Sequence, residues 1–278
     1  MQYQSEIIFH TEIFKLFTCY LVTGGLPEVC SNFVSTTEPL VDRFRQARVT
    51  QQAILNGYFA DIAKHSGKVN SMHIERILRS IPAQMLRNIE ENAPKFQFNN
   101  VVPGIRNFAR LAPAIDWLLK AGLVLKSEIC QSGEQPSGAY CLQNTFKLFC
   151  FDVGLLGLLG DLDAGLVQGF QFGTYKGFFA ESFVAQEFLA CGYRSLHSWR
   201  EKSAEVEFLF PFFTGHSVPI EVKSGHNTKA KSLKKYKLKY APELSFVLSA
   251  RGQITRNAGQ VTAPVYLAGA VGEWLVNP

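Results

Sequence analysis

Residues 219–225, Pro-Ile-Glu-Val-Lys-Ser-Gly, constrain the fold more than any other stretch. The pattern predicts a short strand with a turn after it. Ile220 and Val222 lie on one face and Glu221 and Lys223 on the other, because strand side chains alternate. A carboxylate and an ammonium on one face suit a divalent-metal site that cleaves phosphodiesters, where the lysine steadies a water or a phosphate. A solvated pair on an ordinary strand is the more common meaning of an isolated Glu-x-Lys.

Two upstream segments supply further carboxylates. Glu205 and Glu207 alternate with apolar residues in a second predicted strand. Residues 177–189 have helical periodicity and carry Glu181 off the apolar stripe. The predicted catalytic residues are Glu181, Glu207, Glu221 and Lys223. Glu207 and Glu221 are the predicted metal ligands, with Glu181 and Glu205 as further candidates.

Four motifs occur in a fixed order, at residues 177–187, 198–200, 205–208 and 220–225. Together they resemble the PD-(D/E)xK nuclease-like fold, and more closely the C-terminal domain of a large prokaryotic family of AAA-type ATPases. The resemblance implies Mg²⁺ or Mn²⁺ as the cofactor. Glu207 stands where that family usually has Asp. Its extra methylene weakens the case for cleavage, because Mg²⁺ requires near-octahedral ligands at roughly 2.0–2.1 Å.

The first 35 residues resemble the end of the ATPase domain in that family. A helical pattern stops at Gly24 and Gly25, a C-cap signal, and residues 20–28 match the segment that closes the nucleotide-binding domain. The sequence contains no Gly-x-x-x-x-Gly-Lys-Ser/Thr, so we expect no bound nucleotide and no ATPase activity. We therefore interpret residues 1–35 as the remnant of an ATPase domain.

The rest of the chain divides into three predicted parts. Residues 36–145 predict a helical, winged-helix-like domain whose hairpin comprises residues 123–129 and 139–142. Residues 146–175 read as a connector in which Lys147 and Asp152 could pair, and residues 176–278 as the nuclease-like domain. The predicted fold class is α/β (α+β overall), with a helical winged-helix-like N-terminal part followed by a restriction-endonuclease-like mixed β-sheet flanked by helices.

Basic residues cluster after the Glu-x-Lys motif, although the net charge of +5 is only a mild excess. A basic helix beside a metal-type site could follow a nucleic-acid backbone, and a solvated helix face is the alternative. The predicted nucleic-acid residues are Lys229, Lys231, Lys234, Lys235, Lys237, Lys239, Arg106 and Arg110. We expect nucleic acid as the partner, with DNA as the first choice.

The cysteines and apolar runs suggest a cytoplasmic protein. None of the six cysteines forms Cys-x-x-Cys, and no histidine lies at metal-ligand spacing from a pair of them, so a zinc site is not expected. Reduced, mostly buried thiols are the expectation, although Cys130 and Cys141 bracket a turn and could face each other. The start has no signal-peptide pattern, and the apolar run 146–160 is too short to span a bilayer, so no membrane partner is expected.

Three functions fit these features. The preferred hypothesis is a nucleic-acid-binding, nuclease-like accessory module of the AAA-type ATPase family, weak or inactive as a nuclease. The first alternative is an active Mg²⁺-dependent phosphodiesterase or DNA endonuclease. The second is a protein-interaction module that docks on a partner such as a separate ATPase domain.

Overall fold

The computed structural model describes residues 2–90, 95–99, 101–169, 175–212, 215–224, 230–250 and 253–277. The chain forms two compact units. A helical unit comprises residues 15–125 and 148–175, and a sheet unit comprises residues 1–14, 126–147 and 176–278.

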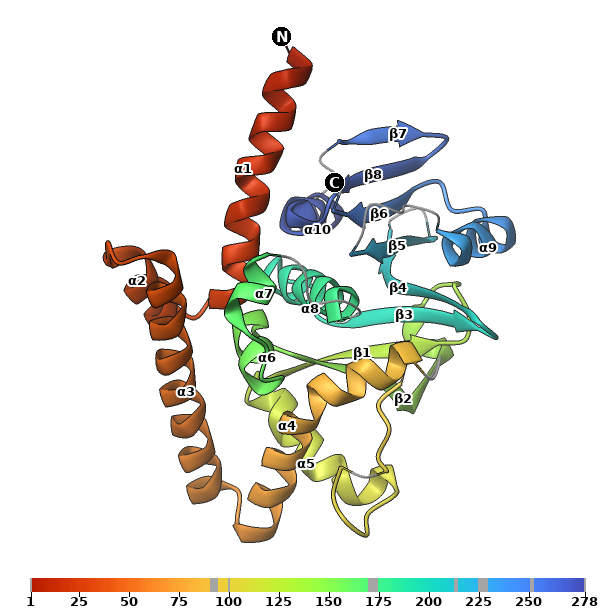
Figure 1. Ribbon diagram of the computed structural model, residues 1–278. Coiled ribbons are helices and arrows are strands. Elements are labelled where there is room, and N and C mark those ends of the chain that lie inside the picture. Colours follow the sequence, from red (N-terminus) through yellow and green to blue (C-terminus); the bar gives the residue numbers. More distant parts are fainter. Residues whose placement is uncertain are drawn as a thin grey trace. The chain divides into compact units, whose positions relative to one another are not determined.

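The helical unit contains the C-terminal part of α1, from Lys15 onward, and the helices α2 to α7 (Figure 1). Their bounds are α1 (Gln2–Thr23), α2 (Pro27–Ser35), α3 (Leu40–His65), α4 (Lys68–Glu90), α5 (Phe108–Lys120), α6 (Val153–Leu159) and α7 (Ala164–Gln168). The long helix α3 is amphipathic because Phe44, Leu55 and Ile62 recur on one buried side. Buried Gln51 of α3 donates to the carbonyl oxygens at the end of α1, which fixes α1 against α3.

Asp152 joins the end of α1 to the start of α6 within the helical unit. Its Oδ2 accepts the Gly25 amide at 2.7 Å, and its Oδ1 accepts the Leu155 amide at 2.9 Å as the N-cap of α6. Gly24 has a φ of 67°, and a Cβ there would collide with the Asp152 carboxylate. The predicted helix end at the glycine pair is confirmed. The predicted pairing of Asp152 with Lys147 is wrong, because the Asp152 carboxylate is engaged by these amides and Lys147 pairs with glutamates instead.

The sheet unit is built on a mixed eight-stranded sheet in the order β2-β1-β3-β4-β5-β6-β8-β7. Its strands are β1 (Val124–Cys130), β2 (Cys141–Cys150), β3 (Leu196–Glu201), β4 (Ala204–Pro211), β5 (Ser217–Lys223), β6 (Ser245–Ser249), β7 (Thr255–Asn257) and β8 (Gln260–Pro264). β1 with β3, β5 with β6, and β6 with β8 are parallel, whereas β3 with β4, β4 with β5, and β7 with β8 are antiparallel. The predicted fold class, a helical N-terminal part followed by a mixed sheet flanked by helices, is confirmed.

The strand pair assigned to a winged-helix hairpin belongs to this sheet. β1 pairs in parallel with β3, and Glu128 lies opposite His197. Ser127, Ile129 and Cys130 are all buried, so both faces of β1 are covered at its end. A wing would leave one face in water, which is why the burial of β1 fits an interior strand of a larger sheet. The division into four parts at residues 35, 145 and 175 stays a prediction.

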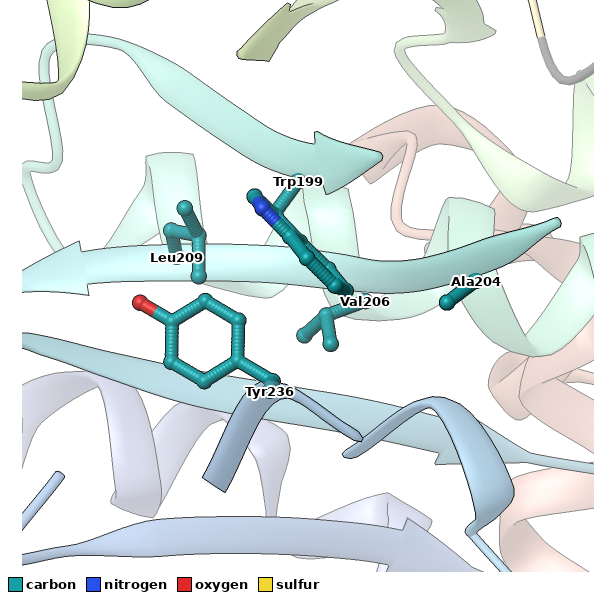
Figure 2. Close-up of a cluster of buried hydrophobic side chains, with 5 residues drawn as sticks. All are labelled: Trp199, Ala204, Val206, Leu209 and Tyr236. Atoms are coloured by element: carbon teal, nitrogen blue, oxygen red, sulfur yellow. The ribbon is translucent and has the colours of Figure 1, made fainter. Parts of the chain in front are cut away.

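Helices cover both faces of the sheet. On one face, Phe188 of α8 (Tyr175–Ala190) packs against Phe208 and Phe210 of β4, with ring centroids 5.4 and 4.5 Å apart. Leu209 points to the opposite face and belongs to a cluster with Tyr236 of α9 (Lys231–Tyr240), shown in Figure 2. The short helix α10 (Ala268–Val276) packs beside α8, since a Cβ at Gly272 would contact Phe188.

Cys130 and Cys141 form a disulfide between the end of β1 and the start of β2. The expectation of reduced thiols throughout is therefore corrected for this pair. Their Cα atoms are 4.1 Å apart because the two residues face each other across the hairpin. Cys19, Cys30, Cys150 and Cys191 are free. Of the helices in the described part of the chain, none is both long and apolar enough to cross a bilayer.

Tyr236 should anchor α9 to the sheet through its ring and its hydroxyl group. The ring is fully buried and packs edge-on to Trp199 at 5.2 Å, and the hydroxyl donates to the Gly133 carbonyl at 3.0 Å. We expect Tyr236→Ala to lower the free energy of unfolding by about 3–5 kcal/mol and Tyr236→Phe by about 1 kcal/mol. Urea unfolding measures both values.

The control for this experiment is Leu238→Ala on the same helix. Leu238 is 79% exposed, so its removal should leave the free energy of unfolding unchanged. Equal costs for Tyr236→Ala and Leu238→Ala would contradict the anchoring role of the Tyr236 ring.

Candidate functional site

The Glu-x-Lys motif occupies the last residues of β5, as predicted. Glu221 Oε1 forms an ion pair with Lys223 Nζ at 2.5 Å. The Glu221 side chain is only 2% exposed, whereas that of Lys223 is 29% exposed. The second oxygen of Glu221, Oε2, is buried and has no hydrogen-bond partner among the described residues. Glu221 therefore has one carboxylate oxygen free for a ligand.

A β-bulge directs Glu207 toward β5. The strand register changes between the pairs His197–Leu209 and Trp199–Val206, so Glu207 and Phe208 together lie opposite a single residue of β3. Such bulges redirect side chains. Glu207 Oε2 accepts a hydrogen bond from the backbone amide of Val222 at 3.0 Å. Val222 is the residue between Glu221 and Lys223. The bulge thus brings the Glu207 carboxylate next to the Glu-x-Lys motif.

Lys147 of β2 supplies a second ammonium group that the sequence analysis did not assign to the site. Its Nζ lies 3.1 Å from Glu181 Oε2 and also forms an ion pair with Glu205 Oε1. The Lys147 side chain is 7% exposed. The available signal was a single lysine inside the apolar run 146–151, where a charge is costly unless a partner is present.

Burial sets the protonation behaviour of the carboxylates. Loss of solvent raises the pKa of Glu205, of Glu221 and, most strongly, of Glu207, where the neighbouring charges of Glu221 and Glu181 add to the effect. Burial alone would lower the pKa of Lys147 and of Lys223. The adjacent carboxylates outweigh burial and raise the pKa of both lysines, so both stay protonated at neutral pH.

The cluster contains all four predicted carboxylates and both lysines. With every group ionised, four negative and two positive charges leave a charge of −2, which one divalent cation would balance. Hard oxygen donors suit Mg²⁺ or Mn²⁺. The unpartnered Oε2 of Glu221 also fits a cation. We infer that Glu207 and Glu221 would hold it, since Lys147 already engages Glu181 and Glu205.

The basic helix α9 presents lysines to solvent within the same unit. Leu233 and Tyr236 are buried against the sheet, so the opposite side of α9 is exposed. The exposed lysines are Lys231, Lys234, Lys235 and Lys239. Beside them, a groove of about 410 Å³ is lined by Ala230, Lys234, Lys237, Leu238 and Gln260.

Not every predicted nucleic-acid residue is equally available. Lys237 is half-buried and its Nζ lies 3.4 Å from Gln260 Oε1, and Lys239 forms an ion pair with Glu201 of β3. Lys229 lies outside the described residues. Arg106 and Arg110 are exposed at the start of α5, in the helical unit. Their role in binding stays a prediction.

These features define a mixed α/β protein with a buried glutamate–lysine cluster and a lysine-rich helix. The chain belongs to the family described as Domain of unknown function (DUF8612), whose model matches residues 14–165. A second model, Domain of unknown function (DUF4143), matches residues 176–267. No curated protein and no solved structure matches the chain. The DUF8612 match includes Lys147, and the DUF4143 match includes all four glutamates and Lys223.

The raised pKa of Glu207 should make stability fall as pH rises above its ordinary pKa of 4.5. In that window the folded state keeps a proton that the unfolded state has lost, so deprotonation favours unfolding. Glu207→Gln removes this effect and should raise the free energy of unfolding at pH 8 by about 1.4 kcal/mol for each unit of the pKa shift. Urea unfolding between pH 4 and pH 8 measures the slope of the free energy of unfolding against pH.

Exposed Glu243 provides the matched control for this prediction. Glu243→Gln should keep the pH slope of the unmodified protein. A Glu207→Gln variant with the same slope as the unmodified protein would show that Glu207 is not held at a raised pKa.

Proposed function

We propose that this protein is a nucleic-acid-binding module with a nuclease-like site that is weak or inactive in phosphodiester cleavage. The observation that supports weak cleavage best is the ion pairing of buried Lys147 with Glu181 and Glu205. An ammonium group in this position neutralises carboxylates that a metal-dependent nuclease needs. The motif resemblance to the PD-(D/E)xK nuclease-like fold and to the C-terminal domain of AAA-type ATPases supports the nucleic-acid role.

Lys147 acts against metal binding in two ways. It holds two of the four carboxylates in ion pairs, and its positive charge repels a cation in the same cluster. Unit charges about 4 Å apart interact by about 4 kcal/mol at an effective dielectric constant of 20, so one ammonium in the cluster is enough to change metal affinity by orders of magnitude. The Glu at position 207 adds a less favourable ligand geometry for Mg²⁺.

Nucleic-acid binding rests on the exposed lysines of α9. Lys231, Lys234 and Lys235 lie on a helix face with Leu238, and no acidic side chain is present on that helix. Lysines contact phosphates without reading base sequence, so the expected binding is dependent on salt and tolerant of sequence. DNA is the substrate that we propose first.

An active Mg²⁺- or Mn²⁺-dependent phosphodiesterase is the second candidate, and the unpartnered Oε2 of Glu221 favours it. Glu207 and Glu221 would hold the cation, which when bound supplies a polarised phosphoryl oxygen and a water of lowered pKa. Lys223 is 29% exposed, so its ammonium group can reach solvent and orient a phosphate or the attacking water.

Replacement of two lysines on α9 should weaken nucleic-acid binding through electrostatics. We expect Lys234→Gln with Lys235→Gln to raise the Kd for a fluorescent DNA duplex about tenfold at moderate salt. The slope of log Kd against log salt should fall by roughly 0.9 for each lost phosphate contact. Fluorescence anisotropy over a salt series measures both quantities.

The matched control removes two positive charges from another part of the chain. Lys64→Gln with Lys68→Gln alters two exposed lysines of the helical unit and should leave both quantities unchanged. Arg106→Gln with Arg110→Gln tests whether the helical unit contributes as well. A Kd for DNA that changes neither with salt concentration nor with the α9 substitutions would contradict the proposed interface.

Removal of the Lys147 ammonium should strengthen metal binding. Lys147→Met is expected to lower stability by about 3–5 kcal/mol, because it leaves buried carboxylates unpaired. Added Mg²⁺ or Mn²⁺ should then raise the Tm of the variant more than that of the unmodified protein, since a ligand that binds only the folded state stabilises it. Thermal unfolding over a metal series measures this difference.

DNA cleavage assays with the same proteins test the alternative function. We expect weak or no cleavage by the unmodified protein, and loss of any cleavage in Lys223→Ala. Efficient Mg²⁺-dependent cleavage that Lys223→Ala abolishes would replace the proposed function with the active phosphodiesterase. Equal metal dependence of Tm with and without Lys147 would contradict the role assigned to this lysine.

A further inference from the structure

Three side chains from neighbouring strands form a second polar cluster in the sheet unit. Glu128 of β1, Cys141 of β2 and His197 of β3 each place a ligand atom within 4.8 Å of the other two. The parallel register of β1 and β3, in which Glu128 lies opposite His197, brings the carboxylate and the imidazole together. All three side chains are partly exposed, so an ion from solvent has access to the cluster.

Cys130, the disulfide partner of Cys141, is the candidate fourth donor. Cys130 is bonded to Cys141 and is therefore adjacent to the same group. Two sulfurs, one imidazole and one carboxylate form a donor set of the type that binds Zn²⁺ tetrahedrally. Only thiolates are strong sulfur ligands for zinc, so the disulfide form cannot provide these two donors.

We propose that Cys130, Cys141, His197 and Glu128 bind one Zn²⁺ when the disulfide is reduced, so that the disulfide and the bound ion exclude each other. This inference does not depend on the proposed function, because the four residues are distinct from the glutamate–lysine cluster. It departs from the sequence-based expectation that a zinc site is absent. The histidine lies far from both cysteines in the sequence, and only the parallel pairing of β1 with β3 brings it close.

The distances are compatible with an ion after small side-chain movements. Zinc bonds of about 2.0–2.3 Å place tetrahedral donors roughly 3.3–3.8 Å apart. His197 Nε2 is 3.8 Å from Glu128 Oε2, which is already in this range. The ligand atoms of Glu128, Cys141 and His197 lie within 4.8 Å of one another, so the Cys141 sulfur has to approach the other two by about 1 Å. Reduction allows the two sulfurs to separate from bonding distance.

Neighbouring groups leave the donors available. Lys126 Nζ holds Glu128 Oε1 at 2.8 Å, so that Oε2 is the oxygen that faces His197. His197 Nδ1 is buried and has no hydrogen-bond partner among the described residues. The ring is therefore not committed to another protein group through that nitrogen. A lysine on the outer oxygen of a ligating carboxylate fixes its orientation.

The redox step is a thiol–disulfide exchange with a dithiol reductant. The Cys130–Cys141 disulfide accepts two electrons and two protons from the dithiol and becomes two thiols, and the dithiol becomes a disulfide. Zinc binding then displaces the two thiol protons to solvent, because both sulfurs ligate as thiolates. In the reverse direction a disulfide oxidant takes two electrons from the two thiolates and, with two protons from solvent, becomes two thiols, while the Cys130–Cys141 disulfide re-forms and the ion is released.

Cobalt titration of the full chain tests this site directly, since Co²⁺ occupies zinc sites and reports thiolate ligands by charge-transfer absorption. Protein reduced with dithiothreitol and desalted without oxygen should bind one Co²⁺ with such absorption, and Zn²⁺ should displace it. Oxidised protein should show no charge-transfer band. Cys141→Ser should lose the band, and His197→Asn should weaken Co²⁺ binding at least tenfold.

Cys191→Ser is the matched control, because Cys191 is a free, partly buried cysteine of the same unit. It should retain the band and the affinity of the reduced protein. Far-ultraviolet circular dichroism confirms that each variant is folded before titration. The proposal is overturned if the reduced protein shows no thiolate-to-cobalt band, if Cys141→Ser keeps it, or if oxidised protein binds Co²⁺ equally well.

Discussion

The ion pairs of buried Lys147 are the interaction on which the interior of the sheet unit depends. Four glutamates lie at or near one buried site, and three of them have a raised pKa because burial opposes their ionisation. Without positive charge nearby, so many carboxylates in one place would be strongly destabilising. Lys147 compensates Glu181 and Glu205, and Lys223 compensates Glu221. This internal balance of charge lets the buried carboxylates lie close together, and the proposed weak metal binding rests on it.

Three separate segments have to meet for this balance to form. β2 brings Lys147, α8 brings Glu181, and the β4–β5 pair brings the remaining carboxylates with Lys223. The β-bulge at Glu207 then turns that side chain toward the backbone of β5. A hairpin that was expected to serve as the wing of a separate domain thus completes the glutamate–lysine cluster of the mixed sheet. The cluster of Glu128, Cys141 and His197 depends on the same placement of β1 and β2.

Local sequence patterns predicted much of the fold, but they predicted only part of the candidate site. The alternation at residues 219–223 and the helical period around Glu181 correctly predicted β5 and α8, because period and propensity are local properties. Lys147 was missed because its partners are 34 and 58 residues away. The pairing of β1 with β3 joins Glu128 to His197 across 69 residues, and no periodicity encodes such a partner. The disulfide was expected only as a minor alternative, because a turn between two cysteines does not fix how their side chains face each other.

A double-mutant cycle between Lys147→Met and Glu205→Gln tests the internal charge balance most directly, with the free energy of unfolding as the measured quantity. If Lys147 compensates Glu205, its removal should cost about 3–5 kcal/mol in the unmodified protein and at least about 1 kcal/mol less when Glu205 is already neutral. Costs that add within about 0.5 kcal/mol would show that the two residues are not coupled, and would contradict the account.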